Sequence, residues 1–360
     1  MTQRERQVLQ LIEKNPLISQ QEIADALGIT RSSAAVHISN LSRKGLIAGR
    51  GYVLRSGSYA VVVGGVNVDI GGRSFEPLVA ADSNPGRVTT SLGGVGRNIA
   101  HNLSLLGTDV RLLTAYGEDN HGAQIAASCS ELGIDISHAL RTSEAPTSTY
   151  VYLADNLGEM ALAVSDMSVC ERITPAYLAS QLPLLQNAQV VVADSNIPKE
   201  SLEFLAQNCS VPLFVDPVST TKAEKIRGIL HGIHTLKPNA LEASLLSGVE
   251  IHDTDDAKKA AKKLLSMGVH RVFISLGSRG VCAARAEECL ILPPIPGNRV
   301  NTTGCGDAFM AALTWAYLEG MDLEHTALAG LAAGSIAMES AETINPALCA
   351  AAVKKRMERR

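Results

Sequence analysis

The chain contains few aromatic residues and no regular cysteine pattern. Only 4% of its 360 residues are aromatic, although 46% are hydrophobic, so aliphatic side chains must fill most of the core. That composition suits helices packed on a parallel sheet better than a β-sandwich. The seven cysteines are scattered, and no two of them stand in a C-x-x-C spacing. This excludes a disulfide framework and a zinc site of that spacing, and it favours a reducing, cytoplasmic environment.

Long apolar runs are also missing. No stretch approaches the ~18 uninterrupted apolar residues that indicate a membrane span, and the first residues lead into an amphipathic pattern without an apolar signal segment. We therefore expect a soluble, cytoplasmic protein with no membrane partner. The length allows one core of roughly 250 to 300 residues and a small additional module, so two domains are expected.

Charge divides the chain into two parts. Residues 1–57 contain eight Lys and Arg against four Asp and Glu, whereas the rest of the chain contains 24 against 32. A basic module and an acidic body differ in the partners that their charge attracts. We expect a small domain at 1–57 and a large domain at 58–360, joined by a flexible Ser-Gly-Ser segment at 56–58.

Three short helices and a small wing are predicted in the basic module. Pro16 ends the first amphipathic stripe, because proline and the residue before it disfavour helix. Ser19 and Glu22 form a capping-box pattern for the second helix, and Thr30 caps a third helix over 31–44. Two short strands around a basic turn are expected to follow.

The outward face of the third helix carries short polar and basic side chains. Such groups can reach base edges and phosphates in a DNA major groove. The candidate DNA contacts are Arg31, Ser32, Ser33 and His37, with Arg50 in the basic turn. Residues 1–57 resemble a winged helix-turn-helix domain, which implies duplex DNA as a partner. The alternative is a three-helix module used for dimerisation, because this helix spacing also occurs in structural bundles.

From residue 59 onward, apolar runs alternate with helical patterns. The first run, at 60–65, ends in two glycines, which is typical of a buried parallel strand. Repetition of this unit predicts a doubly wound, mostly parallel α/β sheet. Ligands collect at the carboxyl ends of such strands. Polar residues follow five of the runs, namely Asn67 and Asp69, Asp194 and Asn196, Asp216, Asn239 and Glu242, and Ser275.

Two segments near the start of the large domain are candidates for substrate binding. Asn67 and Asp69 can hold substrate hydroxyl groups, although Asp69 could also simply cap a turn. The glycine-rich stretch at 93–98 precedes a helix, where backbone amides can approach a ligand closely. It lacks both the Walker and the G-x-G-x-x-G spacing, so it is weak evidence by itself.

A small β lid is predicted over the site. The stretch at 142–165 contains a hairpin-like pair of β-prone runs with a turn between them. Together with the irregular stretch at 71–91 it can form a small sheet. Closure of such a lid excludes water from the site and so prevents hydrolysis of a reactive substrate.

Asn239 and Glu242 stand three residues apart at a predicted helix start. Their oxygen atoms suit a hydrated Mg²⁺ carried on ATP phosphates. A simple N-cap with a carboxylate one turn later explains the same pair equally well. The segment at 276–280 follows an apolar strand and predicts a turn in which the backbone meets a nucleotide.

The stretch at 301–307 (Asn-Thr-Thr-Gly-Cys-Gly-Asp) leads into another helix. Gly304, Cys305 and Gly306 offer consecutive amide donors, which suit the charge of a transferring phosphoryl group. Asp307 is placed to accept the proton of an attacking hydroxyl. Cys305 is a poor candidate for a nucleophile, because no histidine lies near it in the sequence.

The stretches at 93–98, 237–242 and 301–307, in this order, resemble the PfkB, or ribokinase-like, carbohydrate kinase family over about residues 59–350. The resemblance implies that Asp307 is catalytic, that Asn239 and Glu242 organise Mg²⁺, and that the protein forms a lid-to-lid homodimer. The implied substrate contacts are Asn67, Asp69, Gly93, Gly94, Asn98, Thr149, Asn196 and Lys222. The implied nucleotide contacts are Asn239, Ser275, Gly277, Gly280, Thr303 and Asn345.

Within the family, the stretches at 67–70, 93–103, 215–219 and 233–239 look most like those of pseudouridine kinases. The implied reaction is ATP plus pseudouridine giving pseudouridine 5′-phosphate. Lys222 is then a candidate for a base carbonyl or a phosphate, or else a solvated lysine on a charged helix. A kinase for another nucleoside or sugar, or a metabolite-sensing regulator built on a kinase fold, are the alternatives.

Two residues depart from the family pattern. The last motif usually opens with Asp, whose carboxylate helps to hold a monovalent cation, but here it opens with Asn301. This removes a charge and predicts only weak K⁺ dependence. Cys305 stands where Ala or Gly is usual, which leaves its backbone amide available and predicts sensitivity to oxidation.

Overall fold

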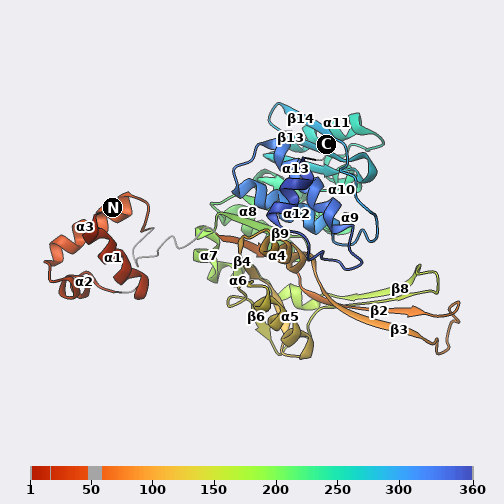
Figure 1. The fold of residues 1–360 in the computed structure, drawn as a ribbon, viewed down its shortest axis with the longest axis horizontal. Helices are drawn as coiled ribbons and strands as arrows, with labels where there is room; N and C mark the ends of the chain where they lie inside the picture. Colours follow the sequence, from red (N-terminus) through yellow and green to blue (C-terminus); the bar gives the residue numbers. More distant parts are fainter. Residues whose placement is uncertain (1, 17, 48–58, 359–360) are drawn as a thin grey trace. The chain divides into compact units, whose positions relative to one another are not determined.

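The computed structural model describes residues 2–16, 18–47 and 59–358. The chain divides into two compact units, Met1–Ser58 and Tyr59–Arg360 (Figure 1). Among the described residues, no helix is long and apolar enough to cross a membrane.

The small unit contains three helices, α1 (Gln3–Lys14), α2 (Gln20–Leu27) and α3 (Arg31–Arg43). Ser19 and Glu22 form the expected capping box of α2, and the Thr30 hydroxyl accepts the Ser33 amide at the start of α3. The side chains of Val8, Ile12, Ile23, Ala34, Ile38 and Leu41 form a small buried core. The predicted wing falls mostly outside the described residues, and so does Arg50.

The large unit is built on an eight-stranded sheet in the order β14-β13-β12-β11-β10-β9-β1-β4. Its strands are β1 (Tyr59–Val63), β4 (Asp109–Leu113), β9 (Val190–Asp194), β10 (Leu213–Asp216), β11 (Thr235–Leu236), β12 (Arg271–Ser275), β13 (Val281–Arg285) and β14 (Glu288–Leu292). All neighbours pair in parallel except β13 and β14, which form an antiparallel edge. The predicted mostly parallel sheet is confirmed.

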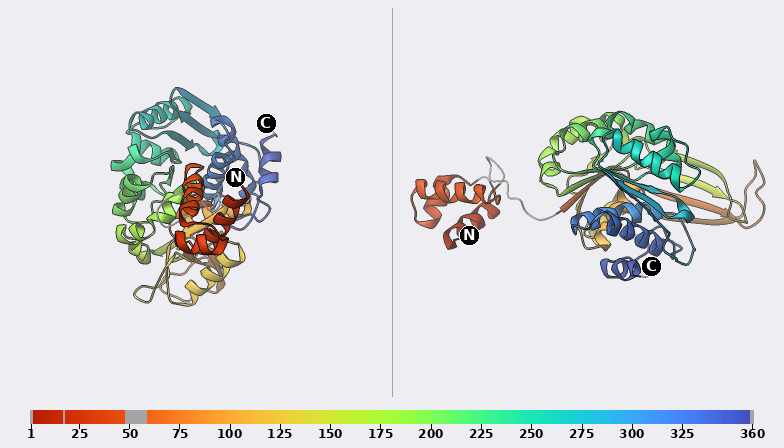
Figure 2. Two further views of the ribbon diagram at one scale, coloured as in Figure 1. Left: turned by 90° about the vertical axis from the view of Figure 1, so that its left-hand side faces the viewer. Right: turned by 90° about the horizontal axis from the view of Figure 1, so that it is seen from above.

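Helices cover both faces of this sheet (Figures 1 and 2). One face packs against α4 (Val95–Leu105), α5 (Asn120–Glu131), α12 (Cys305–Leu318), α13 (Leu323–Ala337) and α14 (Ala350–Met357). The other packs against η1 (Ser168–Arg172), α6 (Pro175–Ser180), α7 (Leu182–Asn187), α8 (Lys199–Asn208), α9 (Thr220–Ala223), η2 (Glu224–Gly232), α10 (Ala240–Ser247) and α11 (Thr254–Ser266).

The strand pattern explains this double covering. In β1, Val61 and Val63 enter the core on one side of the sheet, while Ala60 and Val62 enter the core on the other. Successive side chains of a strand point to opposite faces, so a continuous apolar run needs helices on both. Each buried valine stabilises the fold by about 1.5–3 kcal/mol.

A second sheet projects from this body and has the order β3-β2-β7-β8 (Figures 1 and 2). Its strands are β2 (Asn67–Ser74), β3 (Gly86–Gly93), β7 (Thr149–Ala154) and β8 (Met160–Asp166). Strands β5 (Ala115–Gly117) and β6 (Leu140–Thr142) flank α5 in the sequence and pair as a two-stranded parallel sheet. The four-stranded sheet contains parts of both segments that the sequence assigned to a lid.

Candidate active site

Asp307 lies in the first turn of α12, and its carboxylate meets α4. The Asn98 side-chain amide donates a hydrogen bond to Asp307 Oδ2 over 2.8 Å. The two residues are 209 positions apart in sequence. Helices α4 and α12 pack against each other, so the glycine-rich stretch and the 301–307 loop form one site.

Glycines allow α4 to begin directly against the end of β1. Gly94 has a φ of +97°, and a Cβ at this position would stand 2.5 Å from the Gly65 carbonyl oxygen. A Cβ on Gly96 would stand 2.8 Å from Gly64 Cα. No other residue fits such approaches without moving the backbone. The close packing brings the first turn of α4, and with it Asn98, to the carboxyl ends of the strands.

The loop before α12 is held by its own asparagine and by the segment after α13. Asn301 Nδ2 donates to the Ala341 carbonyl at 3.1 Å, and Asn301 Oδ1 accepts the Thr303 amide at 2.9 Å. Gly304 has a φ of +81°, and a Cβ there would stand 2.2 Å from the Thr343 carbonyl. The glycine therefore lets α12 start with its amide end facing the site, where helix dipoles favour anions.

Two acidic side chains and one lysine lie close to Asp307 at this helix end. Asp194 and Asp216, at the ends of β9 and β10, are buried. The buried Lys237 ammonium pairs with Asp216 Oδ2 at 3.0 Å. It also lies 3.3 Å from the position that a Cβ on Gly306 would occupy. A positive charge thus stands beside the Gly304–Gly306 amides.

The electrostatics poise Asp307 for proton transfer. Burial, together with repulsion from Asp216, raises the pKa of Asp307 to about 7, although the Asn98 hydrogen bond and Lys237 act in the opposite direction. Burial likewise raises the pKa of Asp194 to about 6. A carboxylate with a pKa near neutrality accepts a proton more readily than an ordinary aspartate and is still available in its charged form.

Asp69 and Asn67 form a second polar group at the start of β2. Asn67 Nδ2 donates to Asp69 Oδ1 at 2.6 Å, and burial raises the pKa of Asp69. A Cβ on Gly93 would stand 2.3 Å from Asp69 Oδ2, so this glycine makes room for the carboxylate. Thr149 lies next to Val68 in the β2–β7 pairing, and its hydroxyl donates to the Thr147 carbonyl at 3.1 Å.

A cleft of about 1030 Å³ extends from Asp69 along the second sheet. The lining includes Asp69, Ser91, Tyr150 and Tyr152 from the sheet, and Arg97 and His101 from α4. Asn301, Thr303 and Thr343 close the opposite side. Burial and the neighbouring Arg97 lower the pKa of His101 to about 4, so this imidazole is neutral at pH 7.

Lys222 and Asn196 lie together near Gly65. The Lys222 ammonium donates to Asn196 Oδ1, and the Asn196 backbone amide donates to Asp194 Oδ1 at 2.8 Å. A Cβ on Gly65 would stand 3.3 Å from the Asn196 side chain. The half-buried Lys222 side chain is thus hydrogen-bonded to Asn196, a predicted substrate contact, and is not purely solvated.

Asn239 and Glu242 form a capping box at the start of α10. Asn239 Oδ1 accepts a hydrogen bond from the Glu242 backbone amide. Both oxygens of the buried Glu242 carboxylate accept hydrogen bonds from Asn239, one from its backbone amide and one from its side-chain amide. The local N-cap explanation is therefore correct for these two side chains. Asn239 also forms a parallel bridge with Ser275, which places both beside the predicted nucleotide turn.

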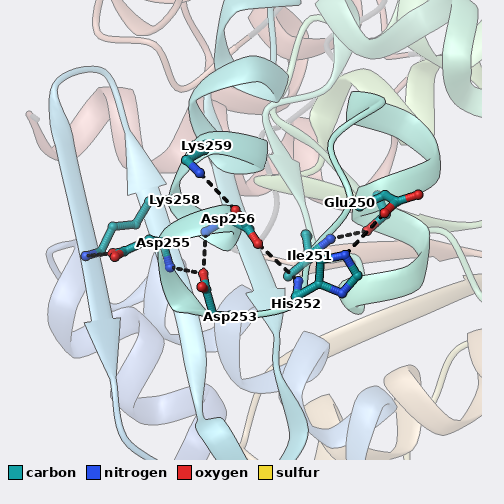
Figure 3. A network of polar contacts seen from close by, with 9 residues as sticks. Glu250, Ile251, His252, Asp253, Asp255, Asp256, Lys258 and Lys259 are labelled. Carbon is teal, nitrogen blue, oxygen red and sulfur yellow. Dashed lines mark hydrogen bonds and ion pairs between the residues drawn. The ribbon is translucent and has the colours of Figure 1, made fainter.

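That turn is η3 (Gly277–Arg279), followed by Gly280. Gly280 has a φ of +89°, and a Cβ there would overlap the Leu292 carbonyl at 1.9 Å. The Arg279 guanidinium donates to the His252 carbonyl. His252 belongs to a polar network before α11 in which Asp253 caps the helix and Lys258 and Lys259 pair with carboxylates (Figure 3). The Arg279 hydrogen bond thus connects the turn to the segment just before α11.

Asn345 has a structural position in the loop after α13. Its Nδ2 donates to the Ile336 carbonyl at 2.7 Å, and its Oδ1 accepts the Ala347 amide at 3.0 Å. These bonds engage both ends of the amide. Cys305 lies in the first turn of α12, and burial, with repulsion from Asp307, raises the pKa of its thiol. A thiol in this state is a poor nucleophile.

Within the described part of the chain, no group of three His, Cys, Asp or Glu side chains could hold a metal ion. The donor set near the helix end suits a different arrangement. Asn239 and Glu242 supply amide and carboxylate oxygens beside Asp216, which are the ligand types that Mg²⁺ prefers, and Mg²⁺ commonly keeps several waters and binds substrate phosphates. The residues fit an ion that arrives with a nucleotide.

The candidate DNA contacts on α3 belong to the small unit. Arg31 and Ser32 are exposed, and Ser33 and His37 are partly exposed. The Thr30 hydroxyl lies within hydrogen-bond distance of both serine hydroxyls. The exposed Val36 lies on the same helix and was not among the predicted contacts.

Several site residues escaped the sequence-based analysis. Arg97 and His101 are one helical turn apart after the glycine stretch, a spacing that could have indicated a common face. The pairing of Lys237 with Asp216 and the contribution of residues 341–344 have no local signal, because they depend on how distant segments meet.

Comparison with known proteins agrees with this geometry. Residues 58–349 match the pfkB family of carbohydrate kinases, and residues 1–48 match winged helix-turn-helix DNA-binding domains. The chain is 40% identical to the uncharacterized sugar kinase YeiI of Escherichia coli over 352 residues, which cover 97% of each protein. It is also 40% identical to the pseudouridine kinase of Escherichia coli over 302 residues, covering 83% of this chain and 96% of that protein.

Solved structures show the same fold. A carbohydrate kinase from Agrobacterium tumefaciens superimposes with a TM-score of 0.75 at 27% identity, and the match covers 84% of this chain and 98% of that one. A ribokinase from Thermotoga maritima superimposes with the same TM-score of 0.75 at 23% identity, and the match covers 84% of this chain and all of the other.

Proposed function

Because the chain belongs to the PfkB family of carbohydrate kinases, we propose that it transfers the γ-phosphoryl group of ATP to the 5′-hydroxyl of pseudouridine. It is a phosphotransferase with an alcohol group as acceptor and carries a winged helix-turn-helix domain at its N-terminus. The observation that carries the proposal is the Asn98–Asp307 hydrogen bond beside the amides of 304–306. The pseudouridine kinase relative supports the choice of substrate.

In this mechanism Asp307 accepts the proton of the 5′-hydroxyl as the oxygen attacks phosphorus. Asn98 orients the carboxylate through the 2.8 Å hydrogen bond. The backbone amides of Gly304, Cys305 and Gly306 stabilise the charge that spreads over the transferring phosphoryl group, which is the main task of the protein in phosphoryl transfer. The Lys237 ammonium adds positive charge beside Gly306.

Substrate binding uses the start of β2 and the glycine stretch. Asp69 accepts hydrogen bonds from sugar hydroxyls, Asn67 holds Asp69 in place, and Gly93 and Gly94 allow the sugar to approach the backbone. Thr149, Asn196 and Lys222 complete the proposed contacts, with Lys222 directed at a base carbonyl. The rings of Tyr150 and Tyr152 supply apolar area for a nucleobase on the same side of the cleft.

In this proposal the nucleotide binds beside α10 and the turn η3, whereas the substrate binds beside β2 and α4. Kinases of this family use ATP with Mg²⁺, and the ion, when bound with ATP, neutralises phosphate charge. Asn239 and Glu242 would hold it through water. The backbone around Ser275, Gly277 and Gly280 would lie along the nucleotide, with Thr303 and Asn345 near it. Asn301 lacks the carboxylate of the usual motif, so K⁺ contributes little in this proposal.

A kinase for another sugar or nucleoside is the second candidate. The relative named sugar kinase YeiI matches across 97% of this chain, which includes the N-terminal domain. An ATP-consumption screen over pseudouridine, uridine, cytidine, adenosine, ribose and fructose separates the candidates. We expect the highest kcat/KM with pseudouridine. A higher value with uridine or a free sugar would replace pseudouridine as the substrate but leave the kinase assignment standing.

We further propose that the small unit binds duplex DNA through Arg31, Ser32, Ser33, His37 and Arg50. Short polar and basic side chains on α3 suit a major groove, and phosphate contacts make affinity fall steeply with salt. Titration of the full chain against DNA from its own upstream region, at rising salt, tests this. If the full chain does not bind DNA at low salt, or if Arg31→Ala binds DNA as tightly as the wild type, the dimerisation module is favoured instead.

A homodimer through the second sheet is proposed as well. Its side opposite the cleft exposes Val88, Val151, Leu153, Leu162 and Val164. Exposed apolar patches of this kind mark protein interfaces. Sedimentation of the wild type and of Leu162→Glu tests this proposal, because a charge within the apolar patch should yield monomers. A wild-type monomer would remove the proposal.

A further inference from the structure

Two cysteines face each other at the antiparallel edge of the main sheet. Cys282 on β13 and Cys289 on β14 bring their sulfur atoms to 3.9 Å. Cys282 is paired with Ile291 and Cys289 with Ala284, so the cysteines are diagonal neighbours on one face of the sheet. A disulfide needs a separation of about 2.05 Å. Less than 2 Å of further approach, as a rough estimate from these two distances, would join them.

The position of β14 makes that approach feasible. It is the last strand of the sheet and bonds only to β13. Diagonal neighbours normally stand too far apart for a strain-free bridge, so the backbone must shift. An edge strand can shift without breaking hydrogen bonds to a second strand. The required movement therefore disturbs one strand pairing only.

The two thiols differ in burial and in surroundings. Cys282 is fully buried, whereas Cys289 is partly exposed. A hydrogen bond from Cys282 and the nearby ammonium groups of Lys262 and Lys258 lower the pKa of Cys289. A partly exposed thiolate next to lysines is the environment in which cysteines react with oxidants, and a second thiol within reach resolves the product.

We propose that Cys282 and Cys289 form a reversible disulfide when the protein meets a hydroperoxide. The Cys289 thiolate attacks the peroxide, the O–O bond breaks, and the departing oxygen takes up a proton to leave as an alcohol or water. Cys289 then carries a sulfenic acid. Cys282 attacks this sulfur, the S–O bond breaks, and the hydroxyl leaves as water with the thiol proton. Two thiols are oxidised and one hydroperoxide is reduced.

The bridge would also act on the turn beside it. Gly280 immediately precedes β13 and lies against the Leu292 carbonyl at the end of β14, where a Cβ would stand only 1.9 Å away. Movement of β14 toward β13 alters this contact. If the turn lies along the nucleotide, as proposed above, the oxidised protein has a higher KM for ATP than the reduced protein. That consequence rests on the proposed function, whereas disulfide formation does not.

Mass spectrometry of the full chain tests the disulfide directly. The protein is treated with hydrogen peroxide and then unfolded in denaturant, so that the buried Cys129 and Cys170 are also alkylated if reduced, and the digest is searched for linked peptides. We expect two of the seven cysteines to escape alkylation, a cross-linked pair containing Cys282 and Cys289, and full recovery of thiols after dithiothreitol. Alkylation of both cysteines in peroxide-treated protein, or a link to another cysteine, would overturn the proposal.

Matched variants separate the bridge from damage elsewhere. Cys289→Ser should abolish the linked peptide, and the fold should tolerate serine at this partly exposed position of an edge strand. Cys282→Ser should also abolish the linked peptide, provided that this buried substitution allows folding. Cys349→Ser removes an exposed cysteine at the start of α14 and should leave the link intact. A peroxide-induced rise in KM for ATP that persists in Cys289→Ser would refute the link to the nucleotide turn but not the disulfide in the wild type.

Discussion

Asn98 donates a hydrogen bond to Asp307 across 2.8 Å and 209 positions of sequence. This contact joins the glycine stretch after β3 to the loop before α12. It orients the carboxylate that we propose as the base. Burial raises the pKa of Asp307, and the Asn98 hydrogen bond partly opposes this rise. The expected behaviour of variants follows from this arrangement and from the charges around it.

Replacing Asp307 by Asn should lower kcat by roughly 10²–10⁴-fold, because general-base catalysis typically contributes that much. ATP affinity should change little, since the base acts in the transition state. Steady-state kinetics and ATP binding by calorimetry measure the two effects. Asp82→Asn, at an exposed aspartate outside the site, is the control. Turnover of Asp307→Asn close to that of the wild type would contradict the assignment.

The same variant should be more stable than the wild type above neutral pH. Burial raises the pKa of Asp307 to about 7, so the folded state holds the proton more tightly than the unfolded chain. The resulting stability is present below the ordinary pKa of aspartate and is lost as pH rises through about 7. Melting temperatures of both proteins at pH 5 and pH 8 test this. We expect the variant to gain more in melting temperature at pH 8 than at pH 5, because the wild type has lost only part of this stability at pH 5.

The pH dependence of turnover should depend on Lys237. The wild-type kcat/KM should rise with pH through about 7, as Asp307 of the free enzyme loses its proton. Lys237 lowers the pKa of Asp307, so Lys237→Met should move this rise to higher pH. Lys199→Met, at an exposed lysine on α8, should leave the profile unchanged. A pH profile of kcat/KM for Lys237→Met with the wild-type midpoint would show that the lysine does not act on the base.

Tyr150 should distinguish nucleosides from free sugars. It is paired in register with Asp69 and lines the cleft, so a base joined to a sugar held by Asp69 would lie against its ring. Loss of base stacking costs about 1–3 kcal/mol. Tyr150→Leu should therefore raise KM for pseudouridine about 5- to 150-fold. Val79→Thr, at an exposed residue between β2 and β3 that does not line the cleft, should not. An unchanged KM in Tyr150→Leu would exclude stacking on this ring.

Potassium should have little effect on the rate. Asn301 provides an amide where the family motif usually has a carboxylate, and that amide is already bonded to the Ala341 carbonyl and the Thr303 amide. Exchange of KCl for NaCl at constant ionic strength should change kcat less than about twofold, since a neutral amide attracts a cation more weakly than a carboxylate does. Asn301→Asp should increase the dependence. Strong activation of the wild type by K⁺ would contradict the prediction.

Local patterns determined much of the outcome. The capping box of Ser19 and Glu22 was readable because it lies within four consecutive residues, and so was the buried run of β1. The glycine stretch and the 301–307 loop were recognised as motifs for the same reason. The spacing of Asn239 and Glu242 allowed two interpretations, an N-cap and a pair of oxygen ligands for Mg²⁺. The structure shows the N-cap, and the role in binding Mg²⁺ stays a prediction.

The amino-acid sequence by itself determined the mostly parallel α/β fold class and the family. Only the tertiary structure decided that Asn98 meets Asp307, that Lys237 pairs with Asp216, and that Cys282 faces Cys289. These contacts depend on strand order, crossovers and register. The raised pKa of Asp307 has the same origin, because burial and neighbouring charges come from segments that meet only after folding.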